Sequence, residues 1–397
     1  MKQRSDLTFK HNLARHRHGW LRLTPAYSIK LVNQILDEHT FTSVLEPFSG
    51  TGTTGLVCGE RGIACDLLDI NPFLVWFAKV KTRNYSKAEI TQTRQALADI
   101  LANLKDETEA WHPAIHDIDR WWSISARTLL GQLHNLILQH EGAVRDLLTI
   151  AFCRCSIEWS NAAFNHQSMS FKAPKNMEPE ELFPERETRL ERFAQEVTWI
   201  LEGAATPVQG AVDVRLLDSR NVQVEPEKYD GLITSPPYPN RMSYIRELRP
   251  YMYWLGYLTN ARQAGILDWQ AIGGTWGCAT SLVGKWQPNG TTVPHEGFNE
   301  MIAEIKARSP VLSNYVHKYF IDMVHHLGSV YTQMRPNGRI FYIVGNSKYY
   351  DTIVPVEEIF ASIMRDAGFT DTLVTKIRKR NSKKELYEFI VSARKSA

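Results

Sequence analysis

Val44-Leu45-Glu46-Pro47-Phe48-Ser49-Gly50-Thr51-Gly52-Thr53-Thr54 is the stretch that decides the fold of this chain. Val44 and Leu45 read as the end of an apolar strand. Gly50 and Gly52 allow a tight turn and the close approach of a ligand to the backbone. A helical segment follows from residue 53. Strand, glycine-rich turn and helix in this order predict the first half of a Rossmann-like unit.

A second short apolar strand, residues 63–69, ends in an acid, Asp69. In a Rossmann-like unit, an acid roughly 20 residues after the glycines accepts hydrogen bonds from ribose hydroxyls. The segment therefore predicts a cofactor that contains a ribose.

Thr234-Ser235-Pro236-Pro237-Tyr238 follows the apolar run 231–233, where a buried strand would deliver a rigid loop. The two prolines fix their own φ, donate no N–H and leave carbonyl oxygens available as acceptors. Ser235 adds a hydroxyl acceptor, and Tyr238 adds a flat aromatic face. Methylation of a nucleobase amine requires acceptors for the amine beside such a stacking face. The alternative interpretation is a strand that ends in Pro-Pro with an aromatic plug.

Residues 46–54 resemble the AdoMet-binding motif of amino-methylating DNA methyltransferases, and residues 234–238 resemble their catalytic motif. The resemblance implies S-adenosyl-L-methionine (AdoMet) as cofactor. It also implies an α/β, class I AdoMet-dependent methyltransferase (Rossmann-like) fold with a mixed seven-stranded sheet. An acid that contacts the cofactor adenine corresponds to Asp218, and residues 20–27 resemble the N-terminal motif that closes the methionine side. The implied cofactor-binding residues are Thr24, Glu46, Phe48, Ser49, Gly50, Gly52, Thr53, Asp69, Asn71, Asp218 and Ser219.

The same resemblance implies the reaction. A catalytic motif that begins with Ser is typical of enzymes that methylate cytosine at N4, whereas Asp or Asn is more usual for adenine N6. The substrate would be double-stranded DNA with the target base flipped out, because the amine is inaccessible inside a duplex. A cognate restriction endonuclease is a possible partner. The implied catalytic residues are Ser235, Pro236, Pro237 and Tyr238.

The order of the two motifs is a departure from the family. Many cytosine-N4 enzymes place the catalytic motif first, whereas this chain has the AdoMet motif first. Permuted orders keep the same spatial site, but the position of the target-recognition region stays open. The resemblance covers residues 15–84, 208–258 and 316–397.

Apolar periodicity predicts how the rest of the chain is organised. Helical patterns occupy 28–39, 73–80, 86–107, 125–158, 178–203, 314–334 and 356–367, and strands are predicted at 211–216, 339–344, 369–377 and 386–391, with a turn at 334–338. In a βαβ unit the third strand would follow the second after one helix. Here it arrives only at residue 211, which predicts a helical insertion. The predicted segments are 1–84 (N-terminal motif and first half of the core), 85–207 (helical insertion), 208–258 (core with the catalytic loop), 259–315 (second insertion, candidate recognition region) and 316–397 (end of the core).

Several basic side chains are candidates for DNA contact. Clustered Lys and Arg can neutralise phosphates, as at residues 15–18 and 376–384. Each candidate has an alternative: a packed helix after the catalytic loop, a surface loop at 160–172, and a solvated turn at 376–384. The candidate DNA-binding residues are Arg241, Tyr244, Arg246, Lys172, Arg378, Lys379 and Arg380.

The composition sets further bounds. The chain has 397 residues, 43% of them hydrophobic and 22% charged, which is ordinary for a globular protein. No apolar run approaches the ~20 residues that span a bilayer, and the N-terminus lacks a secretion signal, so a cytoplasmic location is expected. The net charge of +3 is too small to indicate nucleic-acid binding by itself.

The five cysteines do not predict a metal site or a nucleophile. Cys153-Arg154-Cys155 is not a zinc spacing, and no second pair accompanies it. Cytosine-C5 methylation would need a Pro-Cys motif near the catalytic loop, and the sequence has none there. We therefore expect no metal.

Three other functions remain as alternatives. An adenine-N6 methyltransferase would use the same geometry, and an RNA methyltransferase has no recognisable RNA module to support it. A catalytically silent DNA- or AdoMet-binding subunit would be expected to carry a damaged motif, whereas both motifs here are complete.

Overall fold

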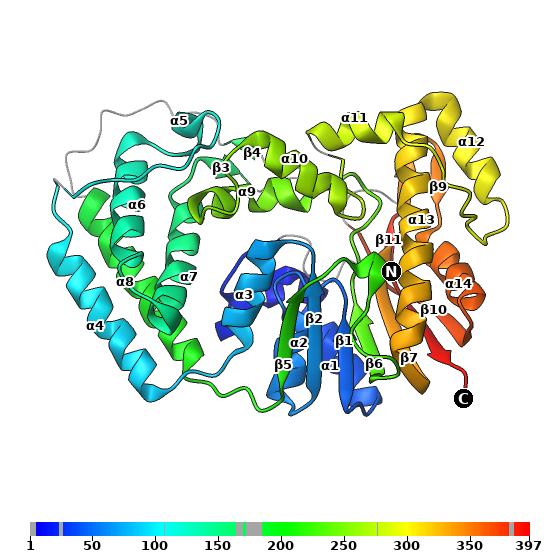
Figure 1. Cartoon of the computed structure of the whole chain (residues 1–397), viewed down its shortest axis with the longest axis horizontal. Helices are drawn as coiled ribbons and strands as arrows, with labels where there is room; N and C mark the ends of the chain where they lie inside the picture. Colours follow the sequence, from blue (N-terminus) through cyan, green and yellow to red (C-terminus); the bar gives the residue numbers. More distant parts are fainter. Residues whose placement is uncertain are drawn as a thin grey trace.

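The computed structural model describes residues 5–23, 27–106, 108–163, 170–171, 185–275, 277–380 and 385–397. A seven-stranded sheet consists of β1 (Ser43–Glu46), β2 (Ala64–Asp69), β5 (Val212–Leu216), β6 (Tyr229–Thr234), β7 (Met334–Gly345), β10 (Phe369–Lys379) and β11 (Tyr387–Lys395). Its strand order is β10-β11-β7-β6-β1-β2-β5 (Figure 1). β11 runs antiparallel to both of its neighbours, and the other pairs are parallel. This mixed sheet belongs to a class I methyltransferase fold, so the predicted fold is confirmed.

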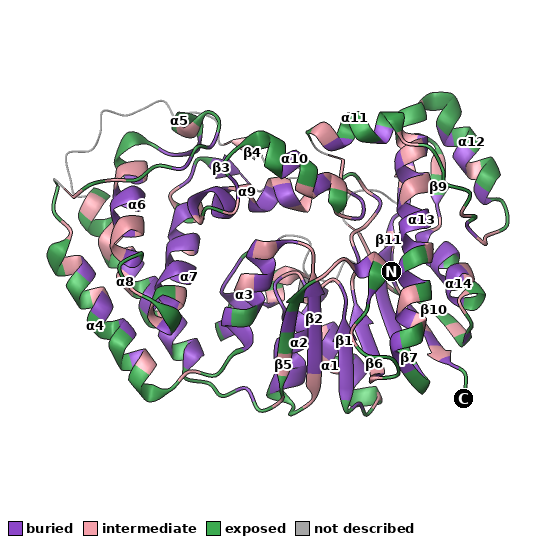
Figure 2. Ribbon diagram, in the orientation of Figure 1, coloured by how far each residue is buried: buried purple, intermediate pink, exposed green. Residues whose placement is uncertain are grey.

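Helices cover both faces of the sheet. They are α1 (Ile29–Glu38), α2 (Thr53–Glu60), α3 (Pro72–Thr82), α13 (Pro310–Gln333) and α14 (Val356–Asp366). Successive side chains of a strand point to opposite faces. Val44 and Ile233 therefore join the core under α1 and α2, while their neighbours Leu45 and Leu232 join the core under α13 and α14. The inner strands β1 and β6 are buried along almost their whole length (Figure 2).

A helical layer lies between β2 and β5 in the chain and beside α3 in space (Figure 1). It consists of α4 (Lys87–Asn103), α5 (Ile118–Trp121), α6 (Ile124–Ile137), α7 (Gly142–Glu158) and α8 (Glu185–Ala204). One apolar core joins this layer to the rest: Phe73 and Phe77 of α3 pack with Leu248 and Met252 of α9 (Tyr244–Trp254) against it. The layer is thus anchored to both the cofactor half and the segment after the catalytic loop.

The helix predicted over 125–158 is wrong in one respect, because two helices occupy this range. The chain leaves the helix after Ile137 and starts again at Gly142. Gly142 has a φ of 55°, in the left-handed region that glycine adopts without a Cβ penalty. The apolar periodicity continues across this turn, so it gave no sign of the break.

More than half of the segment 259–309 is helical. It contains α10 (Ala261–Gln270), α11 (Cys278–Lys285) and α12 (Phe298–Arg308). Two short antiparallel strand pairs lie outside the main sheet: β3 (Ala162–Ala163) with β4 (Ser170–Phe171), and β8 (Ser347–Tyr349) with β9 (Thr352–Val354). The short 3-10 helices are η1 (Ser5–Leu7), η2 (Phe9–His11), η3 (His16–Gly19) and η4 (Ser219–Asn221). Among the described residues, no helix is both long and apolar enough to cross a membrane.

The turn predicted at 334–338 is wrong as a strand boundary, because β7 already begins at Met334. The register with β6 shifts inside this stretch: Tyr229 pairs with Met334, but Gly231 pairs with Arg339. Asn337 has a φ of 65° there. The turn residues therefore form an irregularity within the strand instead of preceding it.

Arg17 ties the N-terminal segment to two helix ends, which corrects the interpretation of residues 15–18 as a phosphate-binding cluster. The Arg17 side chain is buried, with 3% of the residue exposed, and His18 beside it is buried as well. Five hydrogen bonds of 2.6–3.1 Å run from the Arg17 guanidinium to the carbonyl oxygens of Lys81, Arg83, Gly203, Ala204 and Thr206. Arg17 thus satisfies carbonyls at the C-terminal ends of α3 and α8, which lack partners within their own helices.

Replacing Arg17 with methionine should lower the free energy of unfolding by about 2–3 kcal/mol, because several buried carbonyls lose their donor. Urea unfolding measures this change. The matched control is Arg15→Met, since Arg15 is exposed, and it should stay within about 0.5 kcal/mol of the original chain. Equal effects of the two variants would contradict the structural role of Arg17.

Candidate active site

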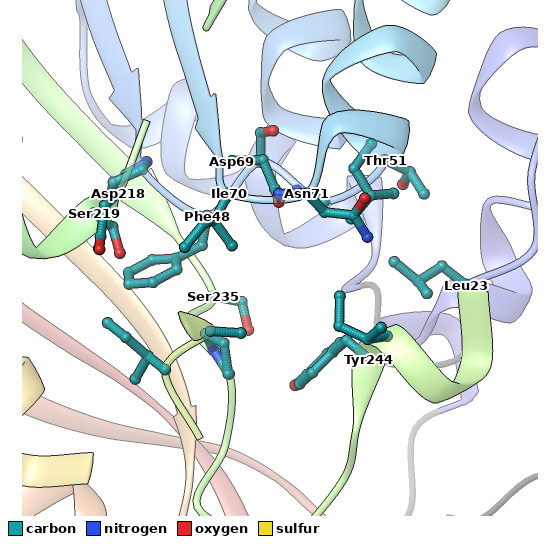
Figure 3. A pocket seen from close by; sticks show the side chains of 18 of the residues that line it. Leu23, Phe48, Thr51, Asp69, Ile70, Asn71, Asp218, Ser219, Ser235 and Tyr244 are labelled. Atoms are coloured by element: carbon teal, nitrogen blue, oxygen red, sulfur yellow. Dashed lines mark hydrogen bonds between the residues drawn. The ribbon is translucent and has the colours of Figure 1, made fainter. Parts of the chain in front are cut away.

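A cavity that is partly open to solvent lies at the carboxyl ends of β1, β2, β5 and β6. In an open α/β sheet this edge is where ligands bind. Figure 3 shows Phe48, Asp218 and Ser219 at one end of the cavity and Leu23 and Thr51 at the other. Ser235 and Tyr244 lie across the cavity from Asp69 (Figure 3). The lining is completed by Tyr27, Pro47, Ser49, Gly50, Thr53, Ile70, Asn71, Leu74, Leu217, Pro237, Ile245, Gln270, Ala271 and Ile272.

The glycine-rich loop after β1 forms one wall. Gly50 and Gly52 have φ values of 50° and 69°, and Gly52 caps the N-terminus of α2. A Cβ added at Gly52 would lie 3.2 Å from the Cβ of Ala78 in α3. The turn and the close helix packing therefore require glycine here, as the sequence predicted.

Asp69 joins this loop to the end of β2. Its two carboxylate oxygens accept hydrogen bonds from the N–H groups of Gly50, at 2.9 Å, and Asn71, at 2.8 Å. Burial raises the pKa of Asp69 to about 6, and these hydrogen bonds oppose the shift. Each carboxylate oxygen can accept a further bond, so Asp69 can bind a diol from the cavity while it holds the loop.

The end of the cavity that is lined by Phe48, Asp218 and Ser219 is suited to a flat ring that bears an amine. Nη2 of Arg220 donates a hydrogen bond of 2.6 Å to the carboxylate of Asp218. Burial alone would raise the pKa of Asp218, but the hydrogen bonds from Arg220 outweigh it and hold the pKa below its usual value. Phe48 packs edge-on against His326, with ring centroids 4.8 Å apart, and this contact fixes its ring beside Asp218. A charged acceptor beside an aromatic ring fits an adenine.

These features together test whether AdoMet fits. The glycine loop, the carboxylate of Asp69 and the pair Phe48 and Asp218 carry the groups that the predicted backbone, ribose and adenine contacts would need, and these contacts stay a prediction. The residues present therefore suit this cofactor.

The loop after β6 brings Ser235 and Pro237, two of the four predicted catalytic residues, to the same cavity. The Ser235 hydroxyl donates to the carbonyl of Ile343 at 3.0 Å, so its oxygen keeps lone pairs as an acceptor. The carbonyl of Pro237 is occupied by the hydroxyl of Tyr319, at 2.7 Å. No hydrogen bond within the described part of the chain uses the carbonyl of Pro236, which also remains an acceptor.

Tyr238 lies next to the cavity and is not among its lining residues. The guanidinium of Arg380 lies over its ring, 5.3 Å from the centroid. Gly345 approaches the ring so closely that an added Cβ would lie 2.9 Å from Cε2 of Tyr238. Arg380 therefore contacts the predicted stacking residue, a role that its place in a basic run did not reveal.

Glu46 is completely buried and lies below the cavity instead of in its wall. Its carboxylate accepts hydrogen bonds from the hydroxyls of Tyr27, Thr54 and Thr234 and from the N–H of Phe48. Burial raises the pKa of Glu46 to about 7, although these hydrogen bonds oppose the shift. Glu46 thus links the cofactor loop to Thr234, the first residue of the catalytic motif.

The raised pKa of Glu46 makes stability depend on pH. A carboxyl that holds its proton more tightly in the folded chain favours folding at acidic pH, and this contribution is lost as the pH rises through about 7. Between about pH 5 and pH 8, the free energy of unfolding should therefore fall by about 1–3 kcal/mol more in the original chain than in Glu46→Gln. Chemical unfolding of both proteins at several pH values measures the difference. Parallel pH profiles would contradict the assignment.

The structure places most of the predicted cofactor residues together. Glu46 and Gly52 shape the loop without lining the cavity, and Thr24 lies outside the described residues. Of the catalytic motif, Ser235 and Pro237 line the cavity. The predicted cofactor residues that line it are Phe48, Ser49, Gly50, Thr53, Asp69, Asn71, Asp218 and Ser219.

The candidate DNA-binding residues that the structure describes differ in their surroundings. Tyr244 lines the cavity, Arg241 is exposed beside the catalytic loop, and Arg246 is half-buried in α9. Lys172 lies outside the described residues. DNA contact by these residues stays a prediction.

The candidates in the run 376–384 have different surroundings. Arg378 makes a two-pronged ion pair with Glu388, with both N–O distances at 2.6 Å, and both side chains are nearly buried. Arg380 contacts Tyr238, and Lys379 is half-buried opposite Tyr387. A phosphate contact by Arg378 would have to compete with its ion pair.

Sequence reasoning missed part of the cavity wall. Leu74 and Ile245 come from helices whose apolar residues read as core. Gln270, Ala271 and Ile272 come from the segment predicted as a recognition region. Arg220 donates to the carbonyl of Gln270 at 2.7 Å, which ties this segment to Asp218. In the sequence, the one indication of this contact is Arg220, a polar residue two positions after Asp218.

The described residues contain no group of three or more His, Cys, Asp or Glu side chains that could hold a metal ion. All five cysteines are unpaired, and Cys58, Cys65, Cys153 and Cys155 are buried.

Known proteins resemble this chain over nearly its whole length. No protein-family model matches it. The Type II methyltransferase M.AvaI of Nostoc sp. (strain PCC 7120) is 22% identical over 422 residues, which cover 96% of this chain and 86% of that protein. The Type II methyltransferase M.BsoBI of Geobacillus stearothermophilus is 20% identical over 460 residues, which cover 99% and 87%. The Type II methyltransferase M.MjaII of Methanocaldococcus jannaschii is 31% identical over 103 residues, 25% of this chain and 19% of that protein.

Proposed function

We propose that this protein is a site-specific DNA methyltransferase that transfers a methyl group from AdoMet to the exocyclic N4 amine of cytosine. One observation carries the proposal: the acceptor oxygen of Ser235 lies in the same cavity as Asp69 and Asp218. A methyl acceptor held by Ser235 would therefore meet a cofactor held by the two acids. The similarity to Type II methyltransferases supports DNA as the substrate.

AdoMet, when bound, supplies an electrophilic methyl group on a sulfonium. Asp69 would accept hydrogen bonds from its ribose hydroxyls, Asp218 from its adenine amine, and Phe48 would pack on the adenine. Leu23 and Thr51 would enclose the methionine end. None of these side chains changes its covalent state during the reaction.

Ser235 and Pro236 would orient the target amine. The cytosine amine is a poor nucleophile because its lone pair is delocalised into the ring. Hydrogen bonds from its two N–H groups to the Ser235 hydroxyl oxygen and the Pro236 carbonyl favour a pyramidal nitrogen, whose lone pair then points at the methyl group. Positioning of this kind supplies several kcal/mol of the acceleration without a strong base. The amine proton leaves to solvent after transfer.

The base must leave the duplex to reach these acceptors. Tyr238 would stack on the flipped base, while Arg380 contacts its ring. Arg241 and Arg246 follow directly in the chain and would contact the DNA around the flipped base. A cognate restriction endonuclease and a cytoplasmic location belong to this proposal, because a methyltransferase of this kind protects cellular DNA.

The choice of cytosine N4 rests on the serine at the start of the motif. Adenine N6 is the alternative, since the same acceptors would hold its amine. Modification-sensitive sequencing of DNA from an expressing host that lacks methylation tests the proposal. We expect N4-methylcytosine at one recurring sequence. N6-methyladenine would overturn the choice of base, and unmodified DNA despite soluble protein would count against the function.

A further inference from the structure

Three buried tyrosine hydroxyls hold the backbone that follows Ser235. The hydroxyl of Tyr319 donates to the carbonyl of Pro237 at 2.7 Å, and that of Tyr349 donates to the carbonyl of Pro239 at 2.6 Å. The N–H of Arg241 donates to the hydroxyl of Tyr315 at 3.2 Å. We call Tyr315, Tyr319 and Tyr349 the tyrosine clamp.

The clamp is a rigid part of the core. Tyr315 and Tyr319 are four residues apart on α13 and therefore share one face of the helix. Tyr349 ends β8, and its ring meets that of Tyr315 edge-on at 6.3 Å. All three residues are at most 6% exposed. Burial raises the pKa of each hydroxyl above its ordinary value, so all three remain protonated.

The clamp restrains the backbone on both sides of the Pro236 carbonyl, which no hydrogen bond among the described residues uses. The ring of Pro237 fixes its φ, and the bond from Tyr319 to its carbonyl restrains its ψ. On the other side of Pro236, the Ser235 side chain is tied to the carbonyl of Ile343. With both flanks held, the carbonyl of Pro236 can point in only one direction.

Arg241 marks the far end of the held segment. Its φ of 63° lies in the left-handed region, where a non-glycine residue is strained. The bond from its N–H to Tyr315 offsets part of that strain and restrains the turn by which the chain leaves the loop for α9.

We propose that Tyr315, Tyr319 and Tyr349 are positioning residues that aim the Pro236 carbonyl at the substrate amine. The proposal rests on the methyltransferase function proposed above and names residues outside the cavity lining and outside the sequence motif. Tyr319 has the largest role because its bond is adjacent to Pro236. Its phenylalanine variant keeps the ring that fills the core and loses only the hydroxyl.

The test compares Tyr319→Phe, Tyr315→Phe and Tyr349→Phe with Tyr229→Phe as a matched control. Tyr229 is equally buried, and its hydroxyl donates to Asp66 at 2.6 Å at the opposite end of β6. Single-turnover methylation of duplex DNA at saturating AdoMet should slow about ten- to a hundredfold in Tyr319→Phe, the scale for misplaced reacting groups. AdoMet affinity should stay within about twofold, because the cofactor wall is untouched. The control should keep its rate even if its stability falls by about 1–3 kcal/mol.

Amide hydrogen exchange of residues 238–246, measured without DNA, tests the clamp independently of activity. Exchange should quicken in the Tyr319 and Tyr315 variants and stay unchanged in Tyr229→Phe. Unchanged exchange in the clamp variants overturns the proposal, and so does faster exchange with a full methylation rate. If the original protein methylates no DNA, the proposed function fails, and the exchange data still decide whether the tyrosines hold the loop.

Discussion

Ser235→Ala should lower the rate of methyl transfer about a hundredfold or more while AdoMet affinity stays within about twofold. Ser235 lines the cavity beside the cofactor wall, and its hydroxyl oxygen keeps lone pairs as an acceptor. Loss of a positioned polar contact of this kind costs about 2.7–4 kcal/mol in the transition state. The cofactor contacts of Asp69 and Asp218 lie on other loops and are not affected. Single-turnover methylation and calorimetric titration with AdoMet measure the two quantities.

A control must separate this effect from the lost bond to Ile343. Ser156→Ala provides one, because the buried Ser156 hydroxyl, like that of Ser235, donates to a backbone carbonyl, that of Cys153, at 2.8 Å. Ser156 lies in α7, away from the cavity lining. The control should lose a similar amount of stability and keep its activity. A rate in Ser235→Ala above half that of the original protein would remove Ser235 from the mechanism.

Asp69→Ala should weaken AdoMet binding by about 3–4 kcal/mol, several hundredfold, because two effects add. The variant loses the predicted ribose acceptor and also the acceptor for the N–H groups of Gly50 and Asn71. Each hydrogen bond to a charged group contributes about 1.5–3 kcal/mol. Calorimetry measures the affinity. Asp69→Asn keeps one acceptor oxygen, so its affinity for AdoMet should lie between those of the original protein and of Asp69→Ala.

The pH dependence of this binding provides an internal check. The pKa of Asp69 is about 6, so the charged acceptor is present above pH 6 and is lost as the pH falls. AdoMet affinity should therefore decline below about pH 6 in the original protein, and this step should be absent in Asp69→Ala. Unaltered affinity in Asp69→Ala would show that Asp69 only supports the loop.

The fold could be predicted because its sequence signals are local. Few alternative folds fit a strand, a glycine turn and a helix at 44–58 that are followed by a strand ending in an acid. Asp69 and Ser235 lie at strand ends, and parallel strands bring their carboxyl ends to one edge of the sheet. Their meeting in one cavity follows from that geometry.

The rest of the site depends on contacts between distant parts of the chain. Tyr315 and Tyr319 read as ordinary apolar positions of a helix, and nothing in their spacing indicates that their hydroxyls meet a loop some 80 residues earlier. Arg378 reads as a surface charge, yet its ion pair with Glu388 forms only when β10 and β11 pair. Gln270 is the last residue of α10, and no local pattern specifies that this helix end meets the cavity.

The most direct test of the central claim is transfer of a labelled methyl group by the purified protein. Duplex DNA from a methylation-free host is incubated with AdoMet that carries an isotopic label on its methyl group. The DNA is then digested to nucleosides and analysed by mass spectrometry. The proposed function predicts that the original protein places the label in N4-methylcytosine. With Ser235→Ala, the amount of labelled N4-methylcytosine should be close to background. AdoMet binding with no label in any nucleoside of DNA would contradict it.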